Sequence, residues 1–268
     1  MTTDELKKAA AELAVTYVKS GMIVGLGTGS TIQFALERIA ELLKIGELKN
    51  IFGIPSSLQT EREAKRLGIP LATLDEYPEI DLTIDGADEI AFGFAESYSD
   101  PVLTGEESLN NFAEGHVASV STEEKTPAKK STNDIYLIKG GGGALLREKV
   151  IAQASKEEII IIDENKFSNV LGTKWAVPIE VIPFALNAEV EFLKSMNAVV
   201  SIRVNNDESK FKTDEGNYII DCNFGKIKDI KALSTLLNCR AGIVEHGIFV
   251  NLVSRVIIAT QEGVKEFS

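Results

Sequence analysis

The sequence predicts an α/β protein: a large Rossmann-like domain with a parallel sheet, and a smaller α+β domain with the ferredoxin-like order βαββαβ. In residues 1–174, short apolar runs alternate with segments whose apolar residues recur at helical spacing, which is typical of a parallel sheet with helices on both faces. From Val177 onward the order changes to strand, helix, strand, strand, helix, strand. A chain of 268 residues with 44% hydrophobic content can bury a full core in such a fold.

The individual elements follow from the apolar periodicity and from the turns between the runs. In the large domain we expect helices at 4–19, 30–44, 57–67 and 144–154, and strands at 22–26, 50–54, near 70, 80–85, 135–138 and 157–163. In the small domain, residues 175–250, we expect a first strand from 177, helices at 185–196 and 228–237, and further strands at 198–204, 216–222 and 242–249.

The most informative stretch is KGGGGALLREK at 139–149. Its run of four glycines leaves the backbone amides uncovered, so they can close around a small anion. Lys139 adds a positive charge, and Glu148 follows as a candidate base. The alternative interpretation is a glycine linker that runs into an amphipathic helix, with Glu148 in a surface ion pair beside Arg147 and Lys149.

A second motif, MIVGLGTGST at 22–31, joins a short strand to the start of a helix through a glycine-rich turn. Free amides and the helix dipole at such a turn favour an anion, and a phosphate group is the ligand expected there. The motif lacks the third glycine of a dinucleotide fingerprint and the lysine of a P-loop. Alternatively, Ser30 or Thr31 only caps the helix.

A third motif, IDLTIDGADE at 80–89, ends a predicted strand in three acids around a Gly86–Ala87 turn. Ligands of α/β sheets bind at the carboxyl ends of the strands, and crowded carboxylates raise one another's pKa, which suits proton transfer near neutral pH. Taken alone, the motif is equally compatible with a surface turn or a cation site. Three such turns, each after a predicted strand, favour one common site.

The charge of the chain excludes some partners. A net charge of −12 and a pI near 4.8 argue against nucleic acid or an anionic membrane, so an anionic ligand would need a local positive pocket, which Lys139, Lys166 and the glycine amides could supply. The two cysteines, Cys222 and Cys239, have neither zinc nor redox spacing. We expect a cytoplasmic protein, because no leader or membrane-length apolar run is present; a plastid would require a transit peptide missing from this chain.

Four motifs occur in order along the chain: GTGST at 27–31, IDGADE at 84–89, KGGGGALLREK at 139–149 and DENK at 163–166. In this combination the chain resembles the type A ribose-5-phosphate isomerase family over nearly its whole length. GIPSS at 53–57 and the wording LGIPLATLDEYP resemble plant and other eukaryotic members. The resemblance implies that the run Arg255–Thr260 returns to the large sheet, so that the catalytic domain comprises 1–174 plus 251–268.

The activity that the resemblance implies is the interconversion of D-ribose 5-phosphate and D-ribulose 5-phosphate through an enediolate, in the non-oxidative pentose phosphate pathway. Glu148 matches the family's base, and Asp85 and Asp88 match acids that contact the sugar hydroxyls, one of which helps to open the furanose ring. Lys139, with the loop amides, would stabilise the enediolate.

The remaining implied positions bind the substrate: Thr28, Gly29, Ser30, Thr31, Gly86, Ala87, Gly140, Gly141, Gly142, Lys166 and Lys7. The phosphate would lie on Thr28–Thr31, Lys166 and Lys7, although either lysine could equally be a solvated surface charge. The route needs no metal and no cofactor, and we expect a homodimer or homotetramer. His116 and His246 are interpreted as structural or incidental.

Two other functional classes share this kind of fold. A sugar-phosphate sensor would normally carry a DNA-binding helix pair, for which this acidic chain has no room. An acyl or CoA transferase, or an amino-sugar-phosphate deaminase, would not be expected to combine the aspartates of DGADE with KGGGGALLREK. A coupled assay with ribose 5-phosphate separates these classes.

Residues 91–133 depart from the family pattern, which joins the acidic turn to the glycine loop by a handful of residues. The segment is rich in Ser, Thr, Glu, Asn and Lys, so we interpret it as a mobile excursion that buries little apolar surface. A regulatory or partner-binding loop and a gene-model error such as translated intron sequence are the alternatives.

Overall fold

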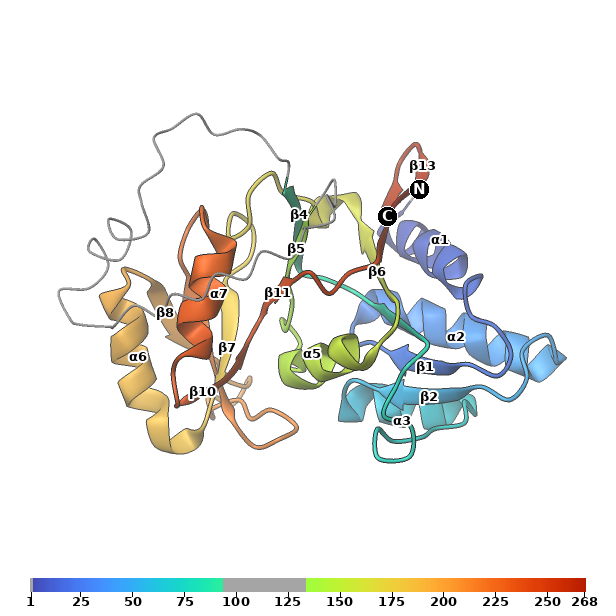
Figure 1. Cartoon of the computed structure of the whole chain (residues 1–268), viewed down its shortest axis with the longest axis horizontal. Helices are drawn as coiled ribbons and strands as arrows, with labels where there is room; N and C mark the ends of the chain where they lie inside the picture. The colour runs from blue at the N-terminus through green and yellow to red at the C-terminus, as the bar shows by residue number, and fades with distance from the viewer. Residues whose placement is uncertain (1, 94–133) are drawn as a thin grey trace, which may run out of the picture.

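The computed structural model describes residues 2–93 and 134–268. Within these residues, a six-stranded sheet, a four-stranded sheet and a three-stranded sheet between them form the framework (Figure 1). The helices are α1 (Thr3–Val15), α2 (Ser30–Ile45), α3 (Leu58–Leu67), α5 (Leu145–Ala154), α6 (Leu186–Ser195) and α7 (Ile230–Asn238), with 3₁₀ turns at Glu164–Lys166 and Pro183–Ala185.

The large sheet has the strand order β13-β12-β6-β3-β1-β2. All its neighbouring pairs are parallel except β12 and β13, which form a hairpin. Its strands are β1 (Ile23–Leu26), β2 (Phe52–Pro55), β3 (Leu82–Asp85), β6 (Glu158–Asp163), β12 (Arg255–Thr260) and β13 (Gly263–Phe267). The expected Rossmann-like sheet is confirmed, and β12 pairs with β6 as the resemblance implied.

Strand β6 shows how the large sheet is covered on both faces, because successive side chains of a strand point to opposite sides. Ile159 and Ile161 pack in the cluster that includes α1 and α2. Ile160 and Ile162 pack in another cluster, toward Leu137 of the three-stranded sheet. Helix α5 lies on this second side and bridges toward the small domain (Figure 1).

The small domain is a four-stranded antiparallel sheet with the order β10-β7-β9-β8. Its strands are β7 (Val177–Val181), β8 (Val199–Ile202), β9 (Tyr218–Asn223) and β10 (Ile243–His246). With α6 after β7 and α7 after β9, the chain follows the predicted βαββαβ order, and both helices lie beside one another over this sheet (Figure 1).

Several predicted elements are wrong in extent or in partner. The strand predicted at 135–138 is not in the parallel sheet: β5 (Asp134–Ile138) pairs antiparallel with β4 (Glu89–Gly93) and with β11 (Ile248–Val250). Strand β4 was not predicted, and it extends the fold into the segment assigned to the excursion. The hairpin strand β13 was also missed.

The strand predicted at 242–249 is two strands in two sheets, because the chain crosses between them at Gly247. A side chain on Gly247 would place its Cβ 2.3 Å from the carbonyl oxygen of Lys139, so only glycine permits this approach. The first helix ends at Val15, four residues earlier than predicted, because the amides of Thr16, Tyr17 and Val18 bond to carbonyls only three residues back. Of the excursion predicted at 91–133, residues 91–93 belong to β4, and residues 94–133 lie outside the described residues.

The first residue of β6 carries a buried carboxyl group, on the face of the strand that packs on the three-stranded sheet. Glu158 is 1% exposed, and neither of its side-chain oxygens has a hydrogen-bond partner among the described residues. Burial raises its pKa to about 8; Lys139 opposes this shift, and Asp85 and Glu148 add to it.

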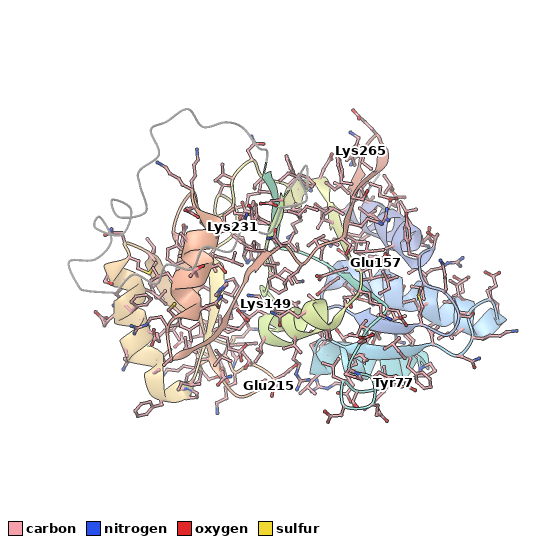
Figure 2. All side chains as sticks on the ribbon, in the orientation of Figure 1. Tyr77, Lys149, Glu157, Glu215, Lys231 and Lys265 are labelled. Atoms are coloured by element: carbon pink, nitrogen blue, oxygen red, sulfur yellow. The ribbon has the colours of Figure 1, made fainter. Side chains whose placement is uncertain are left out.

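We expect Glu158 to make stability depend on pH. Between its ordinary pKa of 4.5 and about 8, the folded protein keeps a proton that the unfolded chain releases, so this contribution to stability falls as pH rises through that range. The Tm of Glu158→Gln minus the Tm of the wild type, both measured by thermal unfolding, should therefore increase from pH 4.5 to 8. Glu157→Gln, at an exposed neighbour whose side chain is labelled in Figure 2, is the control. A constant Tm difference for Glu158→Gln would contradict the assignment.

Candidate active site

A cavity of about 460 Å³ opens at the carboxyl ends of β1, β3 and β6, where α/β sheets bind their ligands. It brings together all the predicted site residues except Asp85. Its lining consists of Lys7, Thr28, Gly29, Ser30, Thr31, Gly86, Ala87, Asp88, Lys139, Gly140, Gly141, Gly142, Glu148, Asp163, Asn165, Lys166, Lys174 and Trp175.

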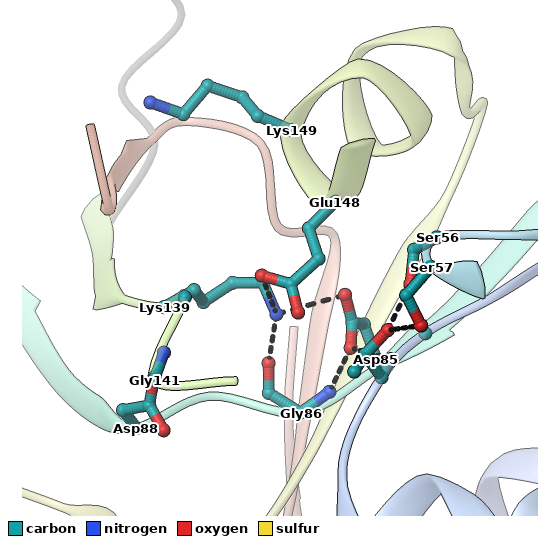
Figure 3. A network of polar contacts seen from close by, with 12 residues as sticks. Ser56, Ser57, Asp85, Gly86, Asp88, Lys139, Gly141, Glu148 and Lys149 are labelled. Atoms are coloured by element: carbon teal, nitrogen blue, oxygen red, sulfur yellow. Dashed lines mark hydrogen bonds and ion pairs between the residues drawn. The ribbon is translucent and has the colours of Figure 1, made fainter. Parts of the chain in front are cut away.

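Lys139 is the centre of the polar network in this wall (Figure 3). Its ammonium group donates to the Gly86 carbonyl oxygen at 2.5 Å and pairs with Asp85 Oδ2 at 2.9 Å. Glu148 Oε2 lies 3.5 Å away, on the side of α5. Because Lys139 is only 2% exposed, water contributes little, and these oxygens compensate the buried charge.

Burial and charge shift the two central pKa values upward for different reasons. Burial by itself would lower the pKa of Lys139, but the carboxylates Asp85, Glu148 and Glu158 outweigh it and raise that pKa, so the lysine stays charged. Burial raises the pKa of Glu148 and Lys139 opposes the shift, while Asp85 and Asp88 add to it. Glu148 is therefore a stronger base than an exposed glutamate.

Glu148 is not a surface residue, so the interpretation as a surface ion pair is wrong. It lies in the first turn of α5, is 5% exposed, and its Oε2 accepts no hydrogen bond among the described residues. Its neighbours turn elsewhere: Arg147 pairs with Glu215, and Lys149 points away from Glu148 in Figure 3 to pair with Glu245 at 2.6 Å. Within the described residues the Glu148 carboxylate therefore pairs only with Lys139, in the wall of the cavity.

Asp85 lies one layer behind the cavity wall rather than in it. It is 1% exposed, and besides Lys139 its carboxylate accepts the amides of Thr28 at 3.1 Å and Gly86 at 2.7 Å. A Cβ on Gly27 would lie 2.2 Å from Asp85 Oδ1, so a glycine is needed beside it. Asp88, by contrast, lines the cavity and accepts the Gly141 amide at 2.7 Å.

The other end of the cavity can hold an anion. Gly29 has φ of 118°, which favours glycine, and no side chain caps the amides at the start of α2. Lys7 reaches the same point and donates to Ser30 Oγ at 2.9 Å. Lys166 approaches from η1 (Glu164–Lys166), with its ammonium 5.1 Å from the centre of the Trp175 ring.

The Thr28 hydroxyl faces away from this anion site. It bonds to Ser56 Oγ at 2.8 Å and Ser57 Oγ at 2.9 Å, and Thr60 Oγ1 lies at 3.2 Å. This hydroxyl cluster anchors the turn after β1 to the start of α3. Thr28 therefore lines the cavity, while its hydroxyl stabilises the turn.

Four lining residues were not predicted from the sequence: Asp163, Asn165, Lys174 and Trp175. The first two belong to the DENK stretch, whose place at the end of β6 could have indicated them. Lys174 and Trp175 follow no motif. The ammonium of Lys174 donates to the carbonyls of Asn165 and Phe167 at 2.8 and 2.5 Å, which ties the two loops together.

The loop that carries Lys174 and Trp175 is held by Glu89, the last acid of IDGADE. Glu89 is fully buried and accepts the Gly172 and Trp175 amides at 3.1 and 3.0 Å, and the Thr173 hydroxyl at 2.9 Å. The third acid of this motif therefore positions a cavity loop from behind.

The described residues include no cluster of three or more His, Cys, Asp or Glu placed to hold a metal ion. His246 is buried, and its Nδ1 accepts a hydrogen bond from the Ile248 amide at 3.2 Å; His116 lies outside the described residues.

Among the helices of the described segments, none has both the length and the apolar character needed to cross a membrane.

Comparisons with known proteins agree with this geometry. A family model described as ribose 5-phosphate isomerase A (phosphoriboisomerase A) matches residues 52–96 and 127–263. Ribose-5-phosphate isomerase A of Desulfatibacillum aliphaticivorans is 47% identical over 263 residues, covering 98% of this chain and 96% of the relative. A probable ribose-5-phosphate isomerase 2 of Arabidopsis thaliana is 40% identical, covering 99% and 87%. Plant proteins are thus among the relatives, together with bacterial ones.

Solved structures give the same result. A D-ribose-5-phosphate isomerase in complex with phospho-erythronic acid has a TM-score of 0.82 at 34% identity, with 100% of both chains covered. The ribose 5-phosphate isomerase of Plasmodium falciparum has a TM-score of 0.79 at 39% identity, covering 99% of this chain and 98% of that one. The predicted fold and family are confirmed, and the chain belongs to the ribose 5-phosphate isomerase A family.

Proposed function

We propose that this chain interconverts D-ribose 5-phosphate and D-ribulose 5-phosphate, as an aldose–ketose isomerase of the non-oxidative pentose phosphate pathway. One observation carries the mechanism. The buried ammonium of Lys139 and the carboxylate of Glu148 lie 3.5 Å apart in the wall of a cavity whose far end can hold a phosphate. Membership of the family supports the choice of substrate.

Glu148 transfers the proton in this proposal. Its carboxylate takes the proton from C2 of the open-chain aldose, the electron pair forms the C1–C2 double bond, and the C1 carbonyl oxygen becomes the oxyanion. The hydroxyl proton of O2 is transferred to the O1 oxyanion through the carboxylate of Asp88. Glu148 then returns its proton to C1, where the electron pair of the double bond forms the new C–H bond, and C2 becomes the carbonyl carbon. The raised pKa of Glu148, caused by burial, suits a group that must both accept and donate the proton.

Lys139 and the glycine loop stabilise the oxyanion. The ammonium is already held by Asp85 and Gly86, so it needs no reorganisation when charge develops on the substrate oxygen. The Gly142 amide makes no hydrogen bond within the described residues, whereas the Gly141 amide is bound by Asp88. Asp88 is also the aspartate that reaches the cavity, so we assign the contacts to the sugar hydroxyls, and the relay of their proton, to it rather than to Asp85.

The phosphate lies on the start of α2 in this proposal. The amides of Ser30 and Thr31, the helix dipole and the charges of Lys7 and Lys166 all favour an anion there.

The expectations of a cytoplasmic enzyme and of a homodimer or homotetramer stay predictions. One Arabidopsis relative, 38% identical, is named chloroplastic.

The first test removes the base. Glu148→Gln keeps the shape of the side chain but cannot accept the proton, so kcat should fall by about 10² to 10⁴ with KM little changed. The measurement is a coupled assay with ribose 5-phosphate. The exposed Glu157→Gln is the matched control and should keep wild-type turnover. Near-normal turnover in Glu148→Gln would refute the assignment.

The second test concerns the phosphate site. Lys166→Ala should raise KM for ribose 5-phosphate but scarcely change the slow turnover of phosphate-free ribose, because this charge acts on the non-reacting end of the substrate. Lys228→Ala, at an exposed lysine of the small domain, serves as the control. An equal effect on both sugars would place Lys166 at the reacting end instead.

A further inference from the structure

Arg203, at the end of β8 in the small domain, reaches the glycine loop of the large domain. Its guanidinium nitrogen Nη1 donates to the carbonyl oxygens of Gly140 and Gly141, each at 3.0 Å. These glycines line the cavity beside Lys139, and Arg203 does not. The small domain therefore touches the reacting end of the site through one side chain that stands behind the loop.

Two contacts hold Arg203 in place. The Asp221 carboxylate of β9 accepts hydrogen bonds from Nε, at 2.9 Å, and from Nη2, so the pair is bidentate. The Phe211 ring lies 5.8 Å from the guanidinium and packs on the same loop, since a Cβ on Gly143 would be 2.5 Å from Phe211 Cζ. The Arg203 side chain is only 15% exposed, so little freedom remains to it.

The two hydrogen bonds help to fix which way the loop amides point, together with the Gly143 amide, which also donates to the Gly140 carbonyl oxygen at 2.9 Å. In a planar trans peptide the carbonyl and the following N–H point in opposite directions. Because the Gly140 and Gly141 carbonyls face Arg203, the Gly141 and Gly142 amides face away from it. The Gly141 amide meets Asp88 Oδ2 at 2.7 Å, and Gly142 lines the cavity with its amide unpaired within the described part of the chain.

We propose that Arg203 is a positioning residue for the isomerisation: it holds the two peptide planes so that their amides, above all that of Gly142, point at the oxyanion. This rests on the proposed function. A hydrogen bond to a carbonyl also polarises its peptide and strengthens the amide as a donor. Lysine could not replace arginine, because one ammonium cannot bind a carboxylate in two places and two carbonyls at once.

The small domain contains a matched control. Arg240 also forms a two-point pair with a carboxylate, with Nε to Glu189 Oε2 at 2.9 Å and Nη2 to Oε1 at 3.2 Å. It also lies over a phenylalanine ring, 4.1 Å from the centre of Phe192. Its side-chain hydrogen bonds among the described residues go to Glu189 and not to the glycine loop. Arg240→Lys therefore reproduces the loss of a structural arginine without disturbing the amides.

The experiment measures kcat, KM and Tm for the wild type, Arg203→Lys and Arg240→Lys. Because misplaced donors act only on the transition state, Arg203→Lys should lower kcat by about 10- to 100-fold with KM little changed. Arg240→Lys should change Tm to a similar degree but keep kcat. If Arg203→Lys keeps kcat, or loses no more than Arg240→Lys, the proposal is overturned. If Arg203→Lys does not fold, Asp221→Asn is the second variant, because it weakens the ion pair that holds the Arg203 guanidinium. It should also lower kcat, and an unchanged kcat in Asp221→Asn would overturn the proposal.

A binding measurement separates this inference from the proposed function. Phospho-erythronic acid carries a planar carboxylate where the enediolate would carry its negative oxygen, whereas ribitol 5-phosphate has the phosphate but no such charge. By calorimetry, Arg203→Lys should weaken phospho-erythronic acid binding about 10-fold or more and leave ribitol 5-phosphate binding unchanged. Equal effects on both ligands would refute the role of Arg203. Absence of turnover in the wild type would instead refute the isomerase assignment, and the binding comparison would still decide about Arg203.

Discussion

The burial of one ammonium group, that of Lys139, is the constraint on which the site depends. A charge removed from water must be compensated by oxygens close by, so the chain has to bring Asp85, Gly86 and Glu148 to the same point. These residues belong to the end of β3, the turn after it and the first turn of α5, while Lys139 itself follows β5. The parallel sheet, the three-stranded sheet and the α5 helix must therefore all be in place before the site exists.

The same constraint explains why some acidic residues of the site are buried behind the cavity and others line it. Asp85 is buried, and its carboxylate oxygens pair with Lys139 and accept two backbone amides. Glu89 is also buried, and its carboxylate oxygens accept hydrogen bonds from the loop at 172–175. Glu148 and Asp88 line the cavity, and within the described residues the Glu148 carboxylate pairs only with Lys139. The buried acids give geometry, and the accessible ones remain for the chemistry.

Much of this architecture could be predicted from local sequence, and the remainder depends on contacts distant in the chain. The isoleucines of β6 and the glycine-rich and acidic turns after strands have signals within a few residues, so the sheet and most of the cavity lining were found. An apolar run at 135–138 indicates a strand but not its partner, and it joined the three-stranded sheet through β4. Periodicity likewise could not show that Asp85 is recessed or that Arg203 meets the glycine loop, because both follow from how the domains pack.

The central claim is that Glu148 moves a proton between two carbons, and its most direct test follows hydrogen. Unlabelled ribose 5-phosphate would be equilibrated with the enzyme in D₂O, and both sugar phosphates examined by NMR. Because a carboxylic acid exchanges its proton with solvent, we predict deuterium at C1 of ribulose 5-phosphate and at C2 of recovered ribose 5-phosphate. Complete retention of the original hydrogen after many turnovers would mean that it moves directly as hydride, which would contradict an enediolate and the role of Glu148.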